Sequence, residues 1–204
     1  MIKAQHHWFY VRFFRLYTRW MLRWHFRKVI IKEDVSAQNK PVFLIGNHFS
    51  WWDGFFAQYL NEKLFHRRFH VMMLEEQLRP RMFLNKAGAF SIRKHSSGVM
   101  ETIDYTRGLL NDPGNLVTMF PQGAIRSMFD FPVKFEKGPA KILQGMEEQV
   151  EVYFMAALVE YFSHRKPTLT LGVRKYTPEG NFRLSAMEDA YNQYLQEMIA
   201  EQKQ

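Results

Sequence analysis

Strand-length and helix-length segments alternate along most of this chain, and this order constrains its fold more than any other feature. Short apolar or alternating runs are followed by stretches with helical periodicity, and glycine, proline and polar turns lie between them. Strands that alternate with helices form an α/β sheet covered by helices. The length of 204 residues suits one domain with a sizeable core. We therefore predict a single α/β domain with a mixed central sheet, preceded by an amphipathic N-terminal helix.

The predicted organisation has an N-terminal segment, residues 1–32, and a body, residues 33–204. The sequence contains neither a repeat nor a low-complexity segment that would mark a further domain. The predicted strands are 29–32, 41–46, 69–74, 90–93, 116–120, 151–158 and 168–175. The predicted helices of the body are 53–63, 75–87, 97–110, 138–148 and 187–202.

The N-terminal segment is predicted to form a helix over residues 8–27 with an aromatic face and a basic face. At about 100° per residue, large apolar side chains fall within one sector and arginines gather on the opposite side. The apolar set is Tyr10, Phe13, Phe14, Tyr17, Trp20, Met21 and Trp24, and the basic set is Arg12, Arg15, Arg19, Arg23 and Arg27. Residues 1–32 hold eight Lys or Arg and no acid. Because the whole chain has 28 Lys+Arg and 20 Asp+Glu, the body is neutral and the net charge of +8 lies in this segment.

Such a helix has three interpretations. Aromatic rings and arginines suit the surface of a membrane that contains anionic lipid, and we expect Arg12, Arg15, Arg19, Trp20, Arg23 and Trp24 to make that contact. The alternative is an aromatic face packed on the core of the domain. A nucleic-acid arm is a third possibility, but the neutral body offers no basic groove, so we expect no nucleic-acid partner.

Composition and apolar patterning limit the compartment and the chemistry. No apolar run approaches the roughly 18 residues that span a bilayer. Arginines interrupt each N-terminal stretch that would serve as the core of a secretory signal. We therefore expect peripheral attachment at the cytoplasmic face of a membrane. The absence of cysteine excludes disulfides, thiolate metal sites and a cysteine nucleophile.

The segment Pro41 to Gly54 carries the clearest chemical pattern. An apolar strand ends in Gly46, His48 follows in the loop, and Asp53 stands where the next helix should begin. Loops at strand ends are where α/β sheets place active sites. A carboxylate there can fix the tautomer of an imidazole and stabilise its cation, so the pair has the composition of a general base. Ser50 can cap the next helix or take part in catalysis; the G-x-S-x-G elbow of a serine hydrolase is absent.

Four segments together resemble the glycerolipid acyltransferase superfamily, which is the superfamily of the lysophosphatidate acyltransferase-like proteins. The family motif N-H-x4-D matches Asn47, His48 and Asp53. The second, third and fourth family blocks are similar to residues 88–94, 120–127 and 152–161. The blocks come in family order and cover about residues 40–165.

The resemblance implies an acyltransferase domain over residues 33–204 and a reaction. His48 would deprotonate a lipid hydroxyl, Asp53 would orient His48, and acyl-CoA or acyl-carrier protein would be the acyl donor and co-substrate. No other cofactor and no metal is implied. Substrate-binding residues implied by the motifs are Asn47, Ser50, Arg93, Lys94, Gln122, Gly123 and Arg126.

The third block departs from the family pattern. Gln122 replaces the usual Glu, Ala124 the usual Thr, and Ile125 stands where Arg is expected, with Arg126 one place late. The acceptor therefore stays open among a lysophospholipid, an aminolipid and a glycolipid. Two other functions are compatible with the sequence: a non-catalytic membrane-associated homologue, and a thioesterase in which water replaces the alcohol.

Overall fold

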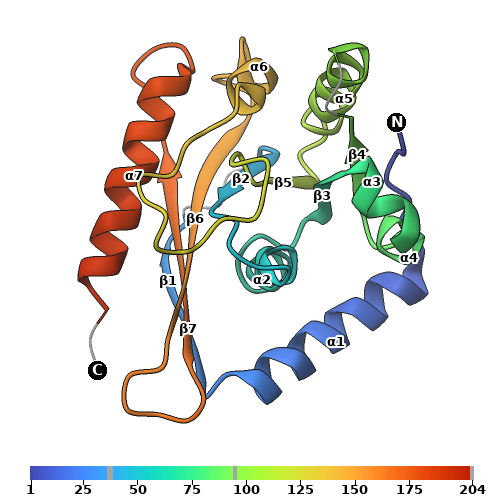
Figure 1. Cartoon of the computed structure of the whole chain (residues 1–204). Coiled ribbons are helices and arrows are strands. Elements are labelled where there is room, and N and C mark those ends of the chain that lie inside the picture. Colours follow the sequence, from blue (N-terminus) through green and yellow to red (C-terminus); the bar gives the residue numbers. More distant parts are fainter. Residues whose placement is uncertain (36–38, 94–95, 203–204) are drawn as a thin grey trace.

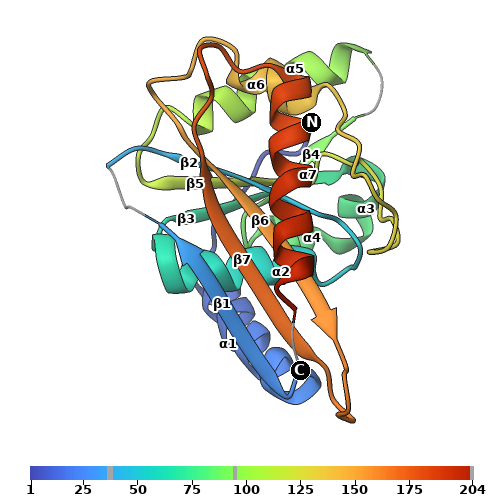
Figure 2. The same cartoon turned by 90° about the vertical axis from the view of Figure 1, so that its left-hand side faces the viewer.

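The computed structural model describes residues 1–35, 39–93 and 96–202, and within them the chain forms one seven-stranded sheet with helices on both faces (Figures 1 and 2). The strand order is β1-β7-β6-β2-β5-β3-β4. Strands β6, β2, β5, β3 and β4 are parallel, whereas β7 is antiparallel to β6 and parallel to β1. The predicted α/β domain with a mixed sheet is confirmed.

The strands are β1 (Lys28–Asp34), β2 (Val42–Gly46), β3 (Arg68–Leu74), β4 (Ala89–Ile92), β5 (Asn115–Met119), β6 (Glu151–Glu160) and β7 (Thr168–Tyr176). The helices are α1 (Trp8–His25), α2 (Asp53–Leu60), η1 (Asn61–Phe65), α3 (Glu75–Leu78), η2 (Arg79–Arg81), α4 (Met82–Asn85), α5 (Ser96–Leu109), α6 (Gly138–Leu143) and α7 (Leu184–Ala200).

Three predicted helices differ in detail from those observed. The helix predicted over 75–87 is broken into α3, the 3-10 turn η2 and α4, because Pro80 lacks the N–H that a continuous helix needs. The helix predicted over 53–63 continues from α2 as the π-helix η1 and ends at Phe65. The helix predicted over 138–148 ends at Leu143.

Side chains from the two faces of the sheet form two apolar clusters. Alternate residues of β2, such as Phe43 and Ile45, pack with α5, α6 and α7 on one face. Val42 and Leu44 point the other way and pack with α1 and α2. This alternation follows from the two-residue repeat of a strand, and burial on both faces explains why β2 reads as a continuous apolar run.

Only part of the predicted aromatic face of α1 is buried against the rest of the domain. Phe14, Met21 and Leu22 are buried beside α2, as the core-packing interpretation requires. Trp20 and Trp24 remain 57 % and 63 % exposed. The aromatic sector is wider than the strip of helix that contacts α2, so the apolar side chains are divided between the core and solvent. Within the described residues, no helix has the length and apolar character needed to cross a bilayer.

The basic side chains of α1 form a separate exposed face. Arg12, Arg15, Arg19 and Arg23 are all exposed, and Arg19 forms an ion pair with Glu62. On the helix they lie between the buried strip and the exposed aromatic side chains. Helix α1 therefore presents two adjacent faces to solvent, one of arginines and one of aromatic rings.

The segment before α1 runs along the edge of the sheet. Ser91 of β4 donates its N–H to the carbonyl of Ile2 at 2.9 Å, and His7 donates its N–H to the carbonyl of Lys86 at 2.9 Å. Asn85 also donates its side-chain amide to the carbonyl of Lys3 at 2.7 Å. The segment therefore covers the edge strand β4 and holds the start of α1 against the domain.

Candidate active site

Loops at the carboxyl ends of neighbouring parallel strands bring the chemical motifs together. β2 is paired with β5, so the loop that carries His48 lies beside the loop that follows Met119. The carboxyl ends of β3 and β4 lie further along the same edge. The pair of His48 and Asp53 and the second and third family blocks therefore share one edge of the sheet, as expected for an open α/β fold.

His48 and Asp53 are in direct contact. Asp53 lies in the first turn of α2 and is fully buried, while the His48 side chain keeps 24 % of its surface exposed. The distance from His48 Nδ1 to Asp53 Oδ2 is 2.8 Å. A carboxylate on Nδ1 fixes the proton there, so Nε2 is the ring nitrogen that can accept a proton from a substrate. This is the geometry of an oriented general base.

Backbone groups hold the Asp53 carboxylate in place. Oδ2 also accepts hydrogen bonds from the N–H groups of Phe49 at 2.8 Å and Ser50 at 2.9 Å. Burial raises the pKa of the Asp53 carboxyl, and the hydrogen bonds from His48, Ser50 and Phe49 oppose that shift. Among the described residues, Asp53 Oδ1 has no hydrogen-bond partner. All of the structural support therefore converges on the oxygen that contacts His48.

The loop after β5 fixes the backbone and the ring of His48. Gln122 Oε1 accepts the His48 N–H at 2.5 Å, and the Arg126 N–H donates to the His48 carbonyl at 2.9 Å. The Phe120 ring stacks on the imidazole with centroids 4.6 Å apart. Gly123 has a φ of 66°, which a residue with a side chain rarely adopts, so glycine suits this turn. The third family block thus holds His48 in position.

Asn47 and Ser50, which the family motif places with the substrate, both contact backbone. Asn47 is buried and its side-chain amide pairs with Ala157, donating to the carbonyl at 2.9 Å and accepting the N–H at 2.9 Å. The amide thus continues the pairing of β2 with β6 beyond the last strand residue. Ser50 Oγ accepts the Trp52 N–H at 3.1 Å and so holds the turn before α2. Both side chains shape the loop around His48.

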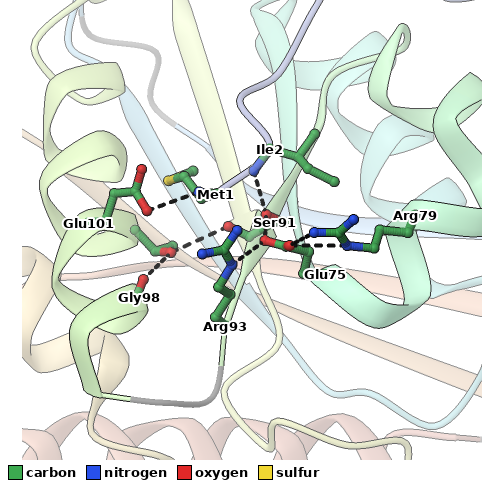
Figure 3. Close-up of polar contacts among 9 residues, drawn as sticks. Met1, Ile2, Glu75, Arg79, Ser91, Arg93, Gly98 and Glu101 are labelled. Atoms are coloured by element: carbon green, nitrogen blue, oxygen red, sulfur yellow. Dashed lines mark hydrogen bonds and ion pairs between the residues drawn. The ribbon is translucent and has the colours of Figure 1, made fainter.

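Arg93 lies at the far end of the same edge. It follows β4, and β5 and β3 lie between β4 and β2, which separates the strand ends by about 14 Å at 4.8 Å per strand. Figure 3 shows the Glu75 carboxylate between two guanidinium groups, with the Arg93 Nε at 2.7 Å and the Arg79 Nη2 at 2.6 Å. These contacts lower the pKa of Glu75 to about 2. Lys94, the neighbouring predicted residue, lies outside the described residues.

Glu75 and Arg79 were not predicted from the sequence. They lie in α3, directly after β3, whereas Arg93 follows β4, so only the pairing of the two strands brings them together. Ser91 Oγ also donates to the Glu75 carboxylate at 3.1 Å. The cluster holds two cations and one anion, and the side chains of Arg79 and Arg93 remain 66 % and 49 % exposed. It can therefore present positive charge to a bound anion.

The loops around His48 carry exposed apolar side chains as well as cations. Ile125, Phe129 and Phe131 of the loop after β5 are exposed, as is Arg126, whose backbone N–H contacts the His48 carbonyl. Trp51, in the loop that follows His48, is half-exposed and receives the Arg81 guanidinium over its ring at 4.9 Å. Exposed groups of both kinds on the loops beside His48 suit a molecule with both an apolar and an anionic part.

Comparison with known proteins identifies one family. A family model described as Acyltransferase matches residues 27–157, which is more than half of the chain. The match includes His48, Asp53 and the loop from Phe120 to Arg126. The comparison with curated proteins finds no match.

Proposed function

The chain belongs to the acyltransferase family, within the glycerolipid acyltransferase superfamily, and we propose that it transfers a fatty acyl group from an acyl thioester to a lipid hydroxyl at a membrane surface. Family membership supports acyl transfer as the general activity. The donor we propose is acyl-CoA or acyl-carrier protein, and the acceptor is a lysophospholipid or a related lipid. His48 acts as the general base and Asp53 orients it.

The observation that carries this proposal is the contact of Asp53 Oδ2 with His48 Nδ1 at 2.8 Å. In the proposed reaction, His48 Nε2 takes the proton of the acceptor hydroxyl while the oxygen attacks the thioester carbonyl. The tetrahedral intermediate then expels the thiolate, which receives the proton from the imidazolium. The new ester bond replaces the thioester bond, and Asp53 stabilises the imidazolium between the two steps.

The acceptor is assigned to the carboxyl edge of the sheet. Its reactive hydroxyl lies at His48, and its anionic headgroup extends toward Arg93, with Arg126 on the loop after β5. Because Gln122 cannot ionise, the acceptor meets a neutral amide where the family pattern has a carboxylate. That favours a headgroup without an additional positive charge at this point.

Membrane attachment is assigned to α1. Its arginine face supplies attraction to anionic lipid of about 1 kcal/mol for each cation near the surface, and its exposed aromatic rings suit the headgroup level. Trp20 and Trp24 are the exposed rings nearest the C-terminal end of α1. In this arrangement the protein binds peripherally, at the face of the membrane where acyl thioesters are made.

The proposal is tested by incubating the purified protein with labelled acyl-CoA or acyl-carrier protein and a panel of lysolipids. We expect an acylated lipid with wild type, none with His48→Ala, and unchanged transfer with His66→Asn, which changes an exposed histidine outside the site. Free fatty acid without acylated lipid would indicate a thioesterase. No product from any pair would favour a non-catalytic homologue.

A further inference from the structure

The turn between β6 and β7 repeats the chemistry of α1. Residues 161–167 read Tyr-Phe-Ser-His-Arg-Lys-Pro and contain no acid. Tyr161 and Phe162 remain 57 % and 41 % exposed, and Arg165 and Lys166 are also exposed. Aromatic rings and cations thus occur together again, in a turn about 140 residues away from α1 in sequence.

The turn lies against the C-terminal end of α1. The Lys166 ammonium sits over the Trp24 ring, 5.6 Å from its centroid, and the Arg27 N–H donates to the Pro167 carbonyl at 2.9 Å. Both cartoon views place the orange β6–β7 turn beside this end of the blue helix (Figures 1 and 2). The turn and the C-terminal end of α1, with its exposed Trp24 ring, are therefore neighbours on the surface.

The backbone of the turn carries strain at an aromatic residue. Phe162 has a φ of 45°, in the left-handed region that favours glycine. A bulky residue is rarely kept there in an exposed turn, because glycine or asparagine would remove the strain. The strain therefore suggests that the ring of Phe162 has a function of its own, for which its backbone conformation is kept.

The turn also projects on the catalytic side of the sheet. Gly46, the last residue of β2, pairs with Met155, and β6 continues five residues further, to Glu160. At about 3.3 Å per residue, the turn extends about 16 Å beyond the strand end that leads to His48. A surface that contacts both the turn and α1 would therefore face the catalytic edge.

We propose that the β6–β7 turn, Tyr161 to Lys166, is a second membrane-binding element that inserts beside α1 and orients the catalytic edge toward a bilayer containing anionic lipid. The positive charge of Arg165 and Lys166 and of the α1 arginines is complementary to such a surface, and Tyr161 and Phe162 supply the rings at the headgroup level. This inference rests on the proposed membrane attachment by α1, and it is independent of acyl transfer.

Single-cysteine probes test the contact, because the chain has no cysteine of its own. An environment-sensitive fluorophore is placed at His164→Cys in the turn, at Leu16→Cys on the exposed side of α1, and at Lys141→Cys on α6 as a remote control. Vesicles of phosphatidylcholine with phosphatidylglycerol should shift the emission of the first two probes to shorter wavelength and leave the third unchanged. A response at position 16 with none at 164 would overturn the proposal and leave α1 as the sole attachment. No response at either position would overturn both.

Charge variants measure how much the turn contributes. Arg165→Gln combined with Lys166→Gln should weaken binding to these vesicles about 25-fold, from about 1 kcal/mol for each cation near an anionic surface. Lys137→Gln combined with Lys141→Gln removes the same charge from another exposed region and should change binding less than threefold. Equal losses from the two pairs would show that only net charge matters and would refute a specific role for the turn.

Replacing Phe162 with Gly distinguishes a role in membrane binding from a role in packing. Phe162→Gly should bind vesicles more weakly yet unfold at an equal or higher urea concentration, because the strain is relieved while the ring is lost. A loss of both stability and binding would assign Phe162 to packing. Labelled acyl transfer to detergent-dispersed acceptor is followed in parallel, so that a failure of the catalytic proposal is separated from a failure of this one.

Discussion

Replacing Asp53 with Asn separates the two roles proposed for this residue. Asp53 Oδ2 accepts hydrogen bonds from the Nδ1–H of His48 and from the backbone N–H groups of Phe49 and Ser50. The amide oxygen of Asn should therefore take the position of Oδ2 and keep the proton on His48 Nδ1. The orientation and tautomer of His48 would then be preserved. The negative charge that stabilises the imidazolium would be lost.

The size of the loss follows from the contact distance. An imidazolium and a carboxylate with charge centres about 4 Å apart attract by about 4 kcal/mol at an effective dielectric constant of about 20. Since about 1.4 kcal/mol corresponds to a tenfold change in rate, Asp53→Asn should slow transfer about a thousandfold. The Asn NH2 group would also occupy the buried position of Oδ1, where the described residues offer no partner, at a cost of about 1–3 kcal/mol in the free energy of unfolding.

The assay compares initial rates of labelled acyl transfer with urea unfolding and with the ¹⁵N chemical shifts of the His48 ring. The shifts should report the same neutral tautomer in both proteins, with the proton on Nδ1. Asp53→Ala is the matched variant that removes the charge and the acceptor together, and it should disturb the tautomer as well. A folded Asp53→Asn protein that retained more than a tenth of the wild-type rate would refute the proposed stabilisation of the imidazolium.

Three further predictions concern two supports of the site, Asn47 and Gln122, and His70, a buried residue of β3 that contacts Asn115. Asn47→Ala removes the paired amide from the backbone of β6 and should lower the free energy of unfolding by about 3 kcal/mol in urea. Gln122→Ala removes the acceptor of the His48 N–H and should lower transfer by at least tenfold, whereas Gln122→Glu, whose carboxylate can accept the same N–H, should stay within threefold. Burial lowers the pKa of His70 to about 4, and the unfolded chain binds that proton near pH 6.5, so stability should fall by about 3 kcal/mol between pH 6.5 and pH 4. His70→Gln should lose correspondingly less in acid, and an identical acid loss in urea titrations of both proteins would contradict this.

Features with a local cause could be predicted from the sequence. The apolar run of β2 and the loop after it indicate a buried strand that ends at a site. The short spacing from His48 to Asp53 predicts that the start of the next helix lies close to the imidazole. The helix of residues 8–27 follows from its periodicity. Their positions depend on residues within a few places of each other in the chain, so patterns of side-chain type are sufficient.

Features that depend on strand pairing could not be predicted in this way. The ion pair of Arg93 with Glu75 requires β3 to lie beside β4, and the amide of Asn47 finds Ala157 only because β2 lies beside β6. The division of the α1 aromatic sector between core and solvent depends on how much of the helix α2 covers. Strand order and the width of a contact between helices depend on the fold of the whole chain. Neither can be predicted from the sequence pattern of one segment.

Helix α1 is fixed at both ends, and this decides how a force on the helix reaches the rest of the protein. Before it, residues 1–7 are hydrogen-bonded along β4, and after it the chain enters β1 at Lys28, at the opposite edge of the sheet. Helix α1 therefore connects the two edges of the sheet. It moves together with the domain, unlike a helix that is joined to a domain by one flexible linker. If α1 adheres to a bilayer, the domain moves with the helix as one body, so the lipid must leave the bilayer to reach the site.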